Sequence, residues 1–258
     1  MEEAASDSST APFTLDSIRD SLIRQEDTII FTLIERSKFP FNSAAYDESF
    51  LKPLNFSGSM VRFVFEGTEA LQAKVGRYEN PREKPFFPEN LPLSLVNPKY
   101  PQVLHPAAAD ININKTIWDM YFSQLLPLFV AEGDDGNYGP TAACDVACLQ
   151  ALSRRIHDGK LVAEIKFKGA PQDYEPAIRA KGRNVIMELL TDERVEEMVK
   201  RRVEKKAMAF GQEVTLDDNK NNTAKYKVDP SVVSHLYGEW VIPLTKLVEV
   251  EYLLRRLD

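Results

Sequence analysis

Cysteine and histidine are scarce in this chain of 258 residues, and their scarcity excludes several metal sites. There are two cysteines, Cys144 and Cys148, and three histidines. A structural zinc site takes about four such ligands in characteristic pairs, so the chain is short of them. Two cysteines four residues apart share one face of a helix, which is typical of small core residues that stay reduced inside the cell.

Positive charge and long apolar runs are also lacking. The chain has 39 Asp and Glu against 32 Lys and Arg, and a formal net charge of -7. Nucleic-acid binding normally requires a basic face, so we expect no nucleic-acid partner. No uncharged apolar run approaches the ~18 residues of a membrane helix, so we expect no membrane partner. The N-terminus has neither the apolar core of a secretory signal nor the arginines of a transit peptide, which predicts residence in the cytosol.

Common catalytic motifs are missing as well. The sequence has no phosphate-binding glycine loop, no serine between paired glycines and no His-Glu zinc helix. No histidine has a glutamate three positions earlier, which excludes the usual carboxylate di-iron bundle. We therefore expect no metal site and no cofactor.

Apolar residues recur at helical spacing through most of the chain. Helices are expected from Thr14 or Asp16 to about residue 39, and over 59–79, 112–130, 141–168, 173–181, 183–190, 192–210 and 230–258. The last of them has a good cap and first position in Asp229 and Pro230. Because no alternation typical of a sheet is present, the expected fold class is all-α, an elongated helical bundle in a single domain.

Three segments interrupt this pattern. Residues 1–12 are expected to form a flexible tail ahead of a helical domain over 13–258. Seven of the 16 prolines lie in a strap at 81–110, where their density excludes helix and central strand alike. A polar loop is expected at 212–229.

The stretch SRRIHDGKLVAEIKF places cations in an apolar run. Arg155 and Lys166 are eleven residues apart, so on one helix they point the same way about 16 Å apart along the axis. A solvated face or ion pairs at the edge of the core would explain them equally well. Arg154 and Lys160 are expected to be ordinary surface or interhelix cations.

Carboxyl groups occur at matching spacing. Thr245 and Glu249 share a face of the last helix, and Glu249 lies between two valines. Apolar surroundings would raise its pKa and let it donate a hydrogen bond, although pairing with a nearby arginine is an equal alternative. Asp192 and Glu196 form another such pair at the start of a helix, where the helix dipole favours acidic residues anyway.

Arginines on the first helix complete the set. Arg19 and Arg24 lie there, and each alone is typical of an ordinary surface cation. Arginines from two helices, a lysine and carboxyls spaced to face them suit a small polyanion, because arginine binds carboxylates in a bidentate fashion. This interpretation requires the first helix and the helix over 141–168 to converge.

Four stretches resemble the eukaryotic, all-helical chorismate mutases of fungi and plants: IRDSLIRQEDTIIFTLIERSKF, KPFFP, CLQALSRRIHDGKLVAEIKF and VIPLTKLVEVEYLLRRLD. The resemblance runs from about residue 14 to the C-terminus, and the acidic N-terminus is similar to that of the cytosolic plant form. It implies a homodimer that converts chorismate to prephenate, for phenylalanine and tyrosine biosynthesis, without a cofactor.

The resemblance also implies catalytic roles. Arg19 and Arg155 match the arginines that grip the two carboxylates of the substrate, and Thr245 matches a hydroxyl that helps to fix one of them. Lys166 matches the donor to the ether oxygen, and Glu249 matches a carboxyl that donates to the same oxygen when protonated.

Two positions near the ring of the substrate complete the implied set. Glu196 matches the acceptor for the ring hydroxyl. Asp192 departs from the fungal pattern, which has asparagine there. An aspartate would repel a dianion unless it is protonated or turned toward a cation.

Regulation is a second departure. Fungal and plastid relatives bind tryptophan and tyrosine at the dimer interface through an arginine pair and small hydroxyl residues. Here Gly76 replaces one arginine beside Arg77, and after Gly139, Pro140 and Ala143 stand where hydroxyls would be. Lost donors leave the charges of an amino acid unpaired, which predicts little or no response to either effector.

Two other functions remain open at this point. One is a non-catalytic helical protein, such as an adaptor or an amino-acid-sensing relative. The other is a bundle lyase or mutase that acts on a related dicarboxylate.

Overall fold

The computed structural model is all-α, as expected, over the residues that it describes, which are 14–108, 110–213 and 225–258. Within these ranges the chain forms no strand, and Gln212 and Tyr226 make an isolated bridge. None of the described helices is long and apolar enough to cross a membrane. The α-helices are α1 (Leu15–Arg36), α2 (Met60–Lys74), α3 (Asn114–Met120), α4 (Tyr138–His157), α5 (Gly159–Gly169), α6 (Pro171–Arg179), α7 (Arg183–Leu190), α8 (Glu193–Gly211), α9 (Pro230–Leu236) and α10 (Ile242–Leu254).

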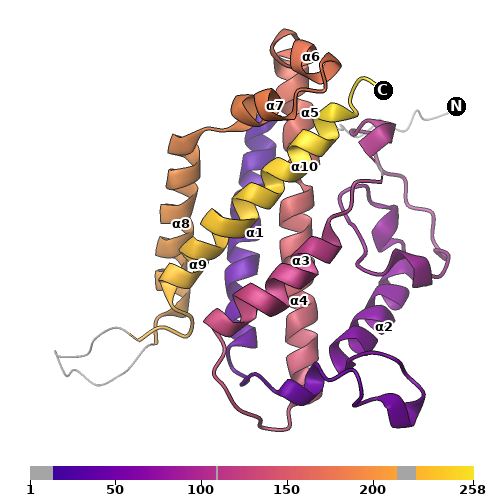
Figure 1. Ribbon diagram of the computed structural model, residues 1–258, viewed down its shortest axis with the longest axis vertical. Helices are drawn as coiled ribbons and strands as arrows, with labels where there is room; N and C mark the ends of the chain where they lie inside the picture. The colour runs from indigo at the N-terminus through magenta and orange to yellow at the C-terminus, as the bar shows by residue number, and fades with distance from the viewer. Residues whose placement is uncertain (1–13, 109, 214–224) are drawn as a thin grey trace, which may run out of the picture.

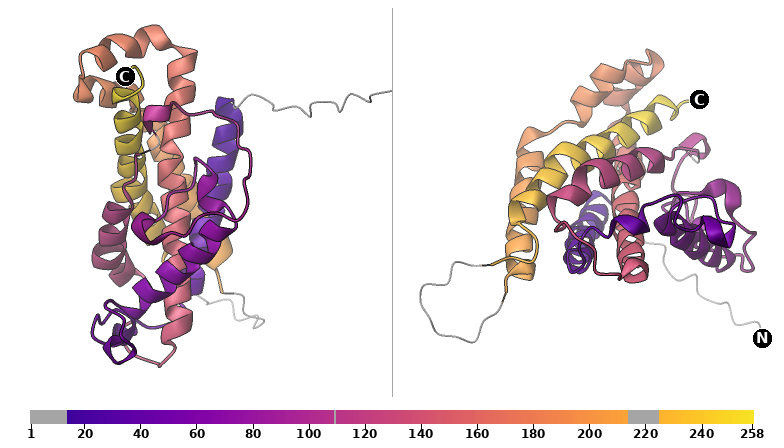
Figure 2. Two further views of the ribbon diagram at one scale, coloured as in Figure 1. Left: turned by 90° about the vertical axis from the view of Figure 1, so that its right-hand side faces the viewer. Right: turned by 60° about the horizontal axis from the view of Figure 1, so that its bottom comes forward.

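The helices form an elongated bundle around two long central ones. α1 and α4 run side by side along the long axis, and α5 continues α4 toward the end covered by α6 and α7 (Figure 1). α8 flanks α1, and α10 crosses α5 and α4, while α2 packs on α4 on another side (Figure 2). The first helix and the 141–168 region therefore converge, as the polyanion interpretation requires.

Local sequence signals define where helices begin. Thr14 Oγ1 accepts a hydrogen bond from the Ser17 amide at 3.1 Å, and the Thr14 amide donates to Ser17 Oγ at 3.0 Å, so the pair forms a capping box for α1. Asp229 caps α9 by accepting from the Ser231 amide at 2.9 Å, and Pro230 is the first helical residue. The predicted cap at Asp229 is confirmed, and Thr14, not Asp16, caps α1.

The prediction of one helix over 141–168 is wrong in one respect. A turn at Asp158 divides this region into α4 and α5. The Asp158 carboxylate is buried and takes two hydrogen bonds from Arg82 and one from Gln25, at 2.5–2.9 Å. These tertiary partners hold the turn in place, and the helix axis continues beyond it (Figure 1).

The expected helices over 112–130 and 230–258 each contain a wider turn. Residues Tyr121–Leu125 and Tyr237–Val241 are π-helical, and a proline follows each of them within two residues, at Pro127 and Pro243. Proline has no amide hydrogen and its ring clashes with the carbonyl four residues earlier, so the chain widens before it.

The proline-rich strap has only two 3-10 turns, Pro88–Asn90 and Pro106–Ala108, between residues 81 and 108. Buried Glu69 of α2 accepts from the amides of Phe86 and Phe87 at 2.8 and 3.0 Å, and the His105 amide donates to Tyr252 of α10 at 3.0 Å. The strap is thus fastened to helices on both sides of the bundle. The expected tail at 1–12 and residues 214–224 of the expected polar loop lie outside the described residues.

A buried polar network joins α1 to α4. The Arg36 and Asp145 side chains are 0% exposed, and Arg36 Nε lies 2.7 Å from Asp145 Oδ1. Tyr121 donates to the same oxygen and Tyr46 to Asp145 Oδ2, both at 2.7 Å. Each charge in the network is therefore paired and hydrogen-bonded, which is the condition for burying it.

Asp145→Asn is expected to lower the free energy of unfolding by about 3–5 kcal/mol, because it leaves the Arg36 guanidinium buried without a counter-charge. Urea unfolding followed by circular dichroism measures the change. The control is Glu35→Gln, which breaks the exposed pair with Lys38 and should cost less than about 1 kcal/mol. Equal losses in the two variants would contradict the prediction.

Candidate active site

One pocket of about 540 Å³ opens between α1, α8, α10 and the joined helices α4 and α5. Its size is typical of a small-molecule site. It brings together all seven residues that the sequence nominated as catalytic or substrate-binding, which are Arg19, Arg155, Lys166, Asp192, Glu196, Thr245 and Glu249. The fold therefore brings these seven residues together, and their catalytic and binding roles stay a prediction.

The two cations of the basic run face the pocket from α4 and α5. Arg155 is 6% exposed and its Nη1 donates to Thr245 Oγ1 at 3.4 Å, while Arg155 Nε has no hydrogen-bond partner in the described chain. Lys166 Nζ donates to the Leu190 carbonyl at 3.3 Å and lies 3.5 Å from Glu249 Oε2. The eleven-residue spacing therefore survives the turn at Asp158.

Glu249 is a buried carboxyl next to a cation. It is 5% exposed, and its Oε2 has no hydrogen-bond partner among the described residues. Burial raises its pKa, and the nearby Lys166 opposes this rise without reversing it. Glu249 therefore holds its proton to higher pH than a free glutamate and offers a hydrogen-bond donor to the pocket.

Two charged side chains lie at the rim of the pocket, and each pairs with a neighbour. Arg19 is 59% exposed at the mouth of the pocket, and its exposed ion pair with Asp16, at 3.3 Å, is weak enough to give way to a ligand. Glu196 Oε1 accepts from Lys246 Nζ at 2.8 Å, and the same nitrogen reaches Thr191 Oγ1 at 3.3 Å. Lys246 thus fixes the direction of the Glu196 carboxylate.

Asp192 is the N-cap of α8. Its Oδ1 accepts from the amides of Arg194 and Val195, both at 3.1 Å. The positive end of a helix stabilises an anion there, so the carboxylate is turned toward favourable charge. This arrangement gives a physical reason why an aspartate is tolerated beside a site for an anion.

The pocket also contains charged residues that the sequence argument missed. Glu26 of α1 is 1% exposed and takes hydrogen bonds from Arg202 at 2.9 and 2.5 Å, and Lys206 lies 3.1 Å from it. Glu26 follows Arg19 by seven residues, two helical turns, so spacing alone would have found it. Lys246 gave no such signal, because it lies beside the Thr245 and Glu249 face and not on it.

The charges in the pocket nearly balance. The cationic side chains that line it are Arg19, Arg155, Lys166, Arg202 and Lys246, and the acidic ones are Glu26, Asp192, Glu196 and Glu249. Five against four gives a net charge of one positive, and protonation of Glu249 makes it two positive. The pocket in that state is matched to a ligand with two negative charges.

Three other cations of the sequence argument lie elsewhere. Arg24 and Arg154 line a separate cleft between α1 and the strap, and Arg154 forms an ion pair with Glu83. Of the two expected places for Lys160, the surface one is wrong, because Lys160 is 1% exposed beneath the strap. Burial, together with the charge of Lys84, lowers the pKa of Lys160 to about 7.

The residues that correspond to an effector site are separated in this chain. Arg77 donates to Glu83 at 3.0 Å and to Gln150 at 2.7 Å, and Gln150 is eleven residues along α4 from Gly139. Eleven residues span about 16 Å of helix. Gly139, Pro140 and Ala143 are exposed at the other end, in the first turns of α4.

Gly76 is held in a tight position beside Arg77. It has a φ of +81°, and an added Cβ would lie 2.8 Å from Val96 and 3.1 Å from Pro98 of the strap. A side chain is therefore excluded on two grounds, the backbone conformation and the space.

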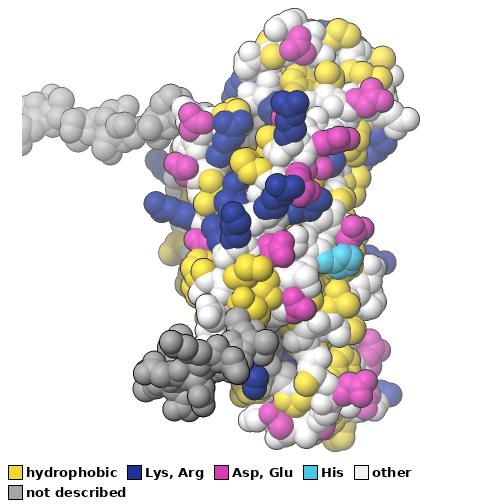
Figure 3. Space-filling model, turned by 90° about the vertical axis from the view of Figure 1, so that its left-hand side faces the viewer, with side chains coloured by type: hydrophobic (Ala, Val, Ile, Leu, Met, Phe, Trp, Pro, Cys, Tyr) yellow, Lys and Arg dark blue, Asp and Glu magenta, His cyan; other side chains and the backbone are white. Residues whose placement is uncertain are grey.

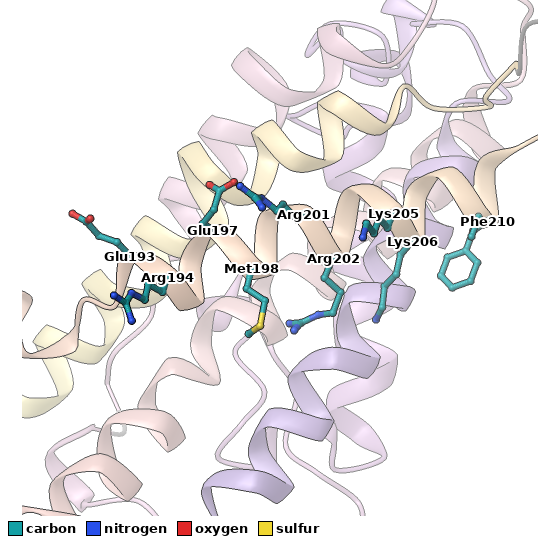
Figure 4. Close-up of a pocket in the computed structure, with 10 residues that line it drawn as sticks. Glu193, Arg194, Glu197, Met198, Arg201, Arg202, Lys205, Lys206 and Phe210 are labelled. Carbon is teal, nitrogen blue, oxygen red and sulfur yellow. The ribbon is translucent and has the colours of Figure 1, made fainter.

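A larger hollow of about 870 Å³ lies along α8. All of its lining residues belong to this one helix, and Figure 4 shows Met198, Arg202 and Lys206 pointing toward α1. The face that carries α8 shows Lys and Arg side chains interleaved with Asp and Glu (Figure 3). A groove with one wall and mixed charge cannot enclose a ligand, so the smaller pocket is the better site.

The histidine and cysteine side chains described below serve the packing and hydrogen bonding of the bundle. Among the described residues no group of three or more His, Cys, Asp and Glu is arranged to hold a metal ion. His157 is 1% exposed and accepts from the Ile113 amide at 3.0 Å, and burial lowers its pKa to about 3. Cys144 and Cys148 are free thiols, and Cys148 is part of the core.

Known proteins are similar to this chain in sequence and in fold. The model of the family described as chorismate mutase type II matches residues 137–250. Chorismate mutase 2 of Arabidopsis thaliana is 64% identical over 248 residues, which cover 95% of this chain and 94% of the relative. The cytosolic chorismate mutase 2 of Zea mays is 54% identical over 249 residues, 95% of this chain and 96% of the relative. The crystal structure of a Candida albicans chorismate mutase in complex with L-Trp superposes with a TM-score of 0.89 at 39% identity, covering 94% of this chain and 91% of that chain.

Proposed function

The chain belongs to the chorismate mutase type II family, and from this premise we propose that it rearranges chorismate to prephenate in the pocket between α1, α5, α8 and α10. The observation that carries the proposal is the convergence of Arg155, Lys166 and Glu249 on that pocket. The product is a precursor of phenylalanine and tyrosine. Similarity to the cytosolic Zea mays form supports a role in the cytosol.

The reaction makes modest chemical demands on the protein. Chorismate and prephenate are isomers, and one carbon–oxygen bond breaks while one carbon–carbon bond forms, with no proton transferred to or from the enzyme. The enzyme has to hold a flexible dianion in a compact chair-like conformer, and it has to stabilise negative charge that develops on the ether oxygen.

Lys166 and Glu249 supply the stabilisation at the ether oxygen. Lys166 Nζ and Glu249 Oε2 are 3.5 Å apart, so one acceptor atom that lies about 2.8 Å from each of them receives hydrogen bonds from both when Glu249 carries its proton. A preorganised donor at a developing oxyanion contributes roughly 10²–10³ in rate. Two such donors account for a large part of an enzymatic acceleration.

The remaining residues hold the substrate. Arg155 offers its unpartnered Nε and lies beside Thr245, and together they bind one carboxylate deep in the pocket. Arg19 binds the other carboxylate from the mouth. Glu196, oriented by Lys246, accepts the hydrogen bond of the ring hydroxyl.

Regulation by aromatic amino acids is proposed to be weak or absent. The Candida albicans relative was crystallised with L-Trp, so the fold as such accommodates this ligand. In this chain Arg77 is already engaged by Glu83 and Gln150, and Gly76 has no room for a side chain. An incoming carboxylate would have to break existing hydrogen bonds, and Gly76 supplies no second arginine next to Arg77 in the chain.

The proposal includes a homodimer. Phe63, Leu71 and Val75 are 53%, 67% and 66% exposed and, with Gly67, follow one another at spacings of four along one side of α2. Exposed apolar stripes of this kind mark protein interfaces.

Lys166→Ala and Arg155→Ala are each expected to lower kcat/KM by at least about a hundredfold, because each removes a charged donor from the reacting dianion. The rate of chorismate loss measures the effect, and far-ultraviolet circular dichroism checks that the helices remain. Lys168→Ala is the matched control on the same helix, since Lys168 is 58% exposed and outside the pocket. Near-normal turnover in the first two variants would refute the site.

Glu249→Gln tests the protonation state. The raised pKa of Glu249 keeps the donor in place to higher pH than in a free glutamate, and kcat/KM falls as rising pH removes its proton. The amide of glutamine donates at every pH, so the variant is expected to flatten this alkaline decline. Glu251→Gln, on the same helix but paired with Arg183 outside the pocket, should leave the decline unchanged. A Glu249→Gln profile that still falls at the same pH would count against a donor role.

Millimolar tryptophan or tyrosine is expected to change the rate at sub-saturating chorismate by less than about twofold, because the donors for an amino acid are lost or occupied. Light scattering in the same buffer is the control, since a monomer would lack an interface site for an unrelated reason. A dimer that responds several-fold to either amino acid would show that the prediction is wrong.

A further inference from the structure

Gly159 lies at the crossing of α5 and α10, on the pocket face of the helix. It is four residues after Arg155 and seven before Lys166, so it shares their side of the joined helices. It is fully enclosed, and α10 covers it with Thr245 and Glu249. The backbones of the two helices therefore approach one another at a point between the two cations.

The space at this glycine is smaller than a methyl group. An added Cβ would lie 2.8 Å from the Thr245 carbonyl oxygen, 3.1 Å from Thr245 Cγ2 and 3.3 Å from Glu249 Cγ. The first of these atoms belongs to the backbone of α10 and cannot turn aside as a side chain does. One methyl group here would push the two helices apart.

Backbone conformation gives no other reason for glycine at this position. Gly159 is not among the residues with positive φ, so alanine adopts the same backbone without strain. Alanine is also the better helix former, and it would favour continuity at the start of α5. The requirement for glycine is therefore a requirement for space.

The pairs that build the site lie on both sides of the crossing. Arg155 reaches Thr245 at 3.4 Å on one side, and Lys166 lies 3.5 Å from Glu249 on the other. Both distances depend on how far α10 lies from the joined helices α4 and α5. A small increase in that separation would lengthen the Arg155–Thr245 hydrogen bond, which is already long at 3.4 Å, and the 3.5 Å ion pair of Lys166 with Glu249.

We propose that Gly159 is a positioning residue for the rearrangement, because its missing side chain sets the separation at which α10 presents Thr245 and Glu249 to Arg155 and Lys166. The inference rests on the proposed function of the pocket. Gly159 itself touches no substrate and acts through these two residues of α10.

The test compares Gly159→Ala with Gly169→Ala in the full chain. Both changes replace a glycine of α5 by the better helix former, but an added Cβ at Gly169 meets no atom within 4 Å. Gly159→Ala is expected to lower kcat at least about tenfold with a smaller change in KM, because misplaced catalytic groups cost more in the transition state than in binding. Gly169→Ala should leave both constants within twofold of wild type.

The pH profile separates positioning from loss of stability. The charged and titratable groups that face Glu249 are Lys166 and Arg155 from the joined helices, Lys246 from α10 and Tyr174 from α6. If α10 moves away, both the burial that raises the pKa of Glu249 and the lysine that lowers it change. The alkaline decline of kcat/KM in Gly159→Ala should then shift along the pH axis, which general destabilisation would not cause.

If Gly159→Ala does not fold, Gly159→Ala with Thr245→Ser replaces it and is compared with Thr245→Ser alone. The serine keeps the hydroxyl and removes the methyl group 3.1 Å from the new Cβ. The same loss in kcat is expected relative to the single variant.

Wild-type kinetic constants in Gly159→Ala would overturn the inference while leaving the proposed function intact. Equal losses in Gly159→Ala and Gly169→Ala, or an unshifted pH profile, would also overturn it. Absence of turnover in the wild-type protein would instead refute the proposed function.

Discussion

The proposed site depends on one buried carboxyl whose pKa is raised although it lies beside a cation. Two effects compete at Glu249: burial favours the neutral acid, and Lys166 at 3.5 Å favours the carboxylate. Burial is the larger effect, so the pKa remains raised and Glu249 is able to donate. Were the lysine to dominate, the two side chains would neutralise one another and leave one donor fewer for the ether oxygen.

Interactions elsewhere in the bundle fix the helices around Glu249 and Lys166 relative to one another. The Arg36–Asp145 network fixes α1 against α4, and the hydrogen bonds of Arg82 and Gln25 to Asp158 hold the turn between α4 and α5. Glu26 with Arg202 joins α1 to α8 at the pocket wall. Because these buried charges are paired with each other, they leave Arg155 and Lys166 available for a ligand. Preorganisation of this kind is how an enzyme stabilises charge that develops in a transition state.

Much of the fold and of the candidate set was predictable from local sequence. The all-α class, the cap at Asp229 and the shared face of Arg155 and Lys166 follow from helical periodicity, which depends on neighbours in the chain. The turn at Asp158 was not predictable, because the residues that hold it come from α1 and the strap. Periodicity also gave no sign that Lys160 is buried, since the strap that covers it is distant in sequence.

Within the site too, local sequence signals identified residues but could not show contacts between segments that are distant in the chain. Spacing nominated Glu249 but could not tell a protonated donor from an ion-paired glutamate, because that depends on how tightly α10 packs on α5. The capping role of Asp192 needs only the start of α8, yet its place beside the pocket needs the whole bundle. Lys246, which orients Glu196, lies off the apolar face and became visible only in three dimensions.

The direct measurement for the central claim is the fate of chorismate with the purified wild-type protein. Loss of chorismate absorbance is followed while prephenate is quantified after acid conversion to phenylpyruvate. Saturable loss of chorismate with formation of an equal amount of prephenate is the result that the account predicts. Unchanged chorismate, or a product other than prephenate, would contradict it.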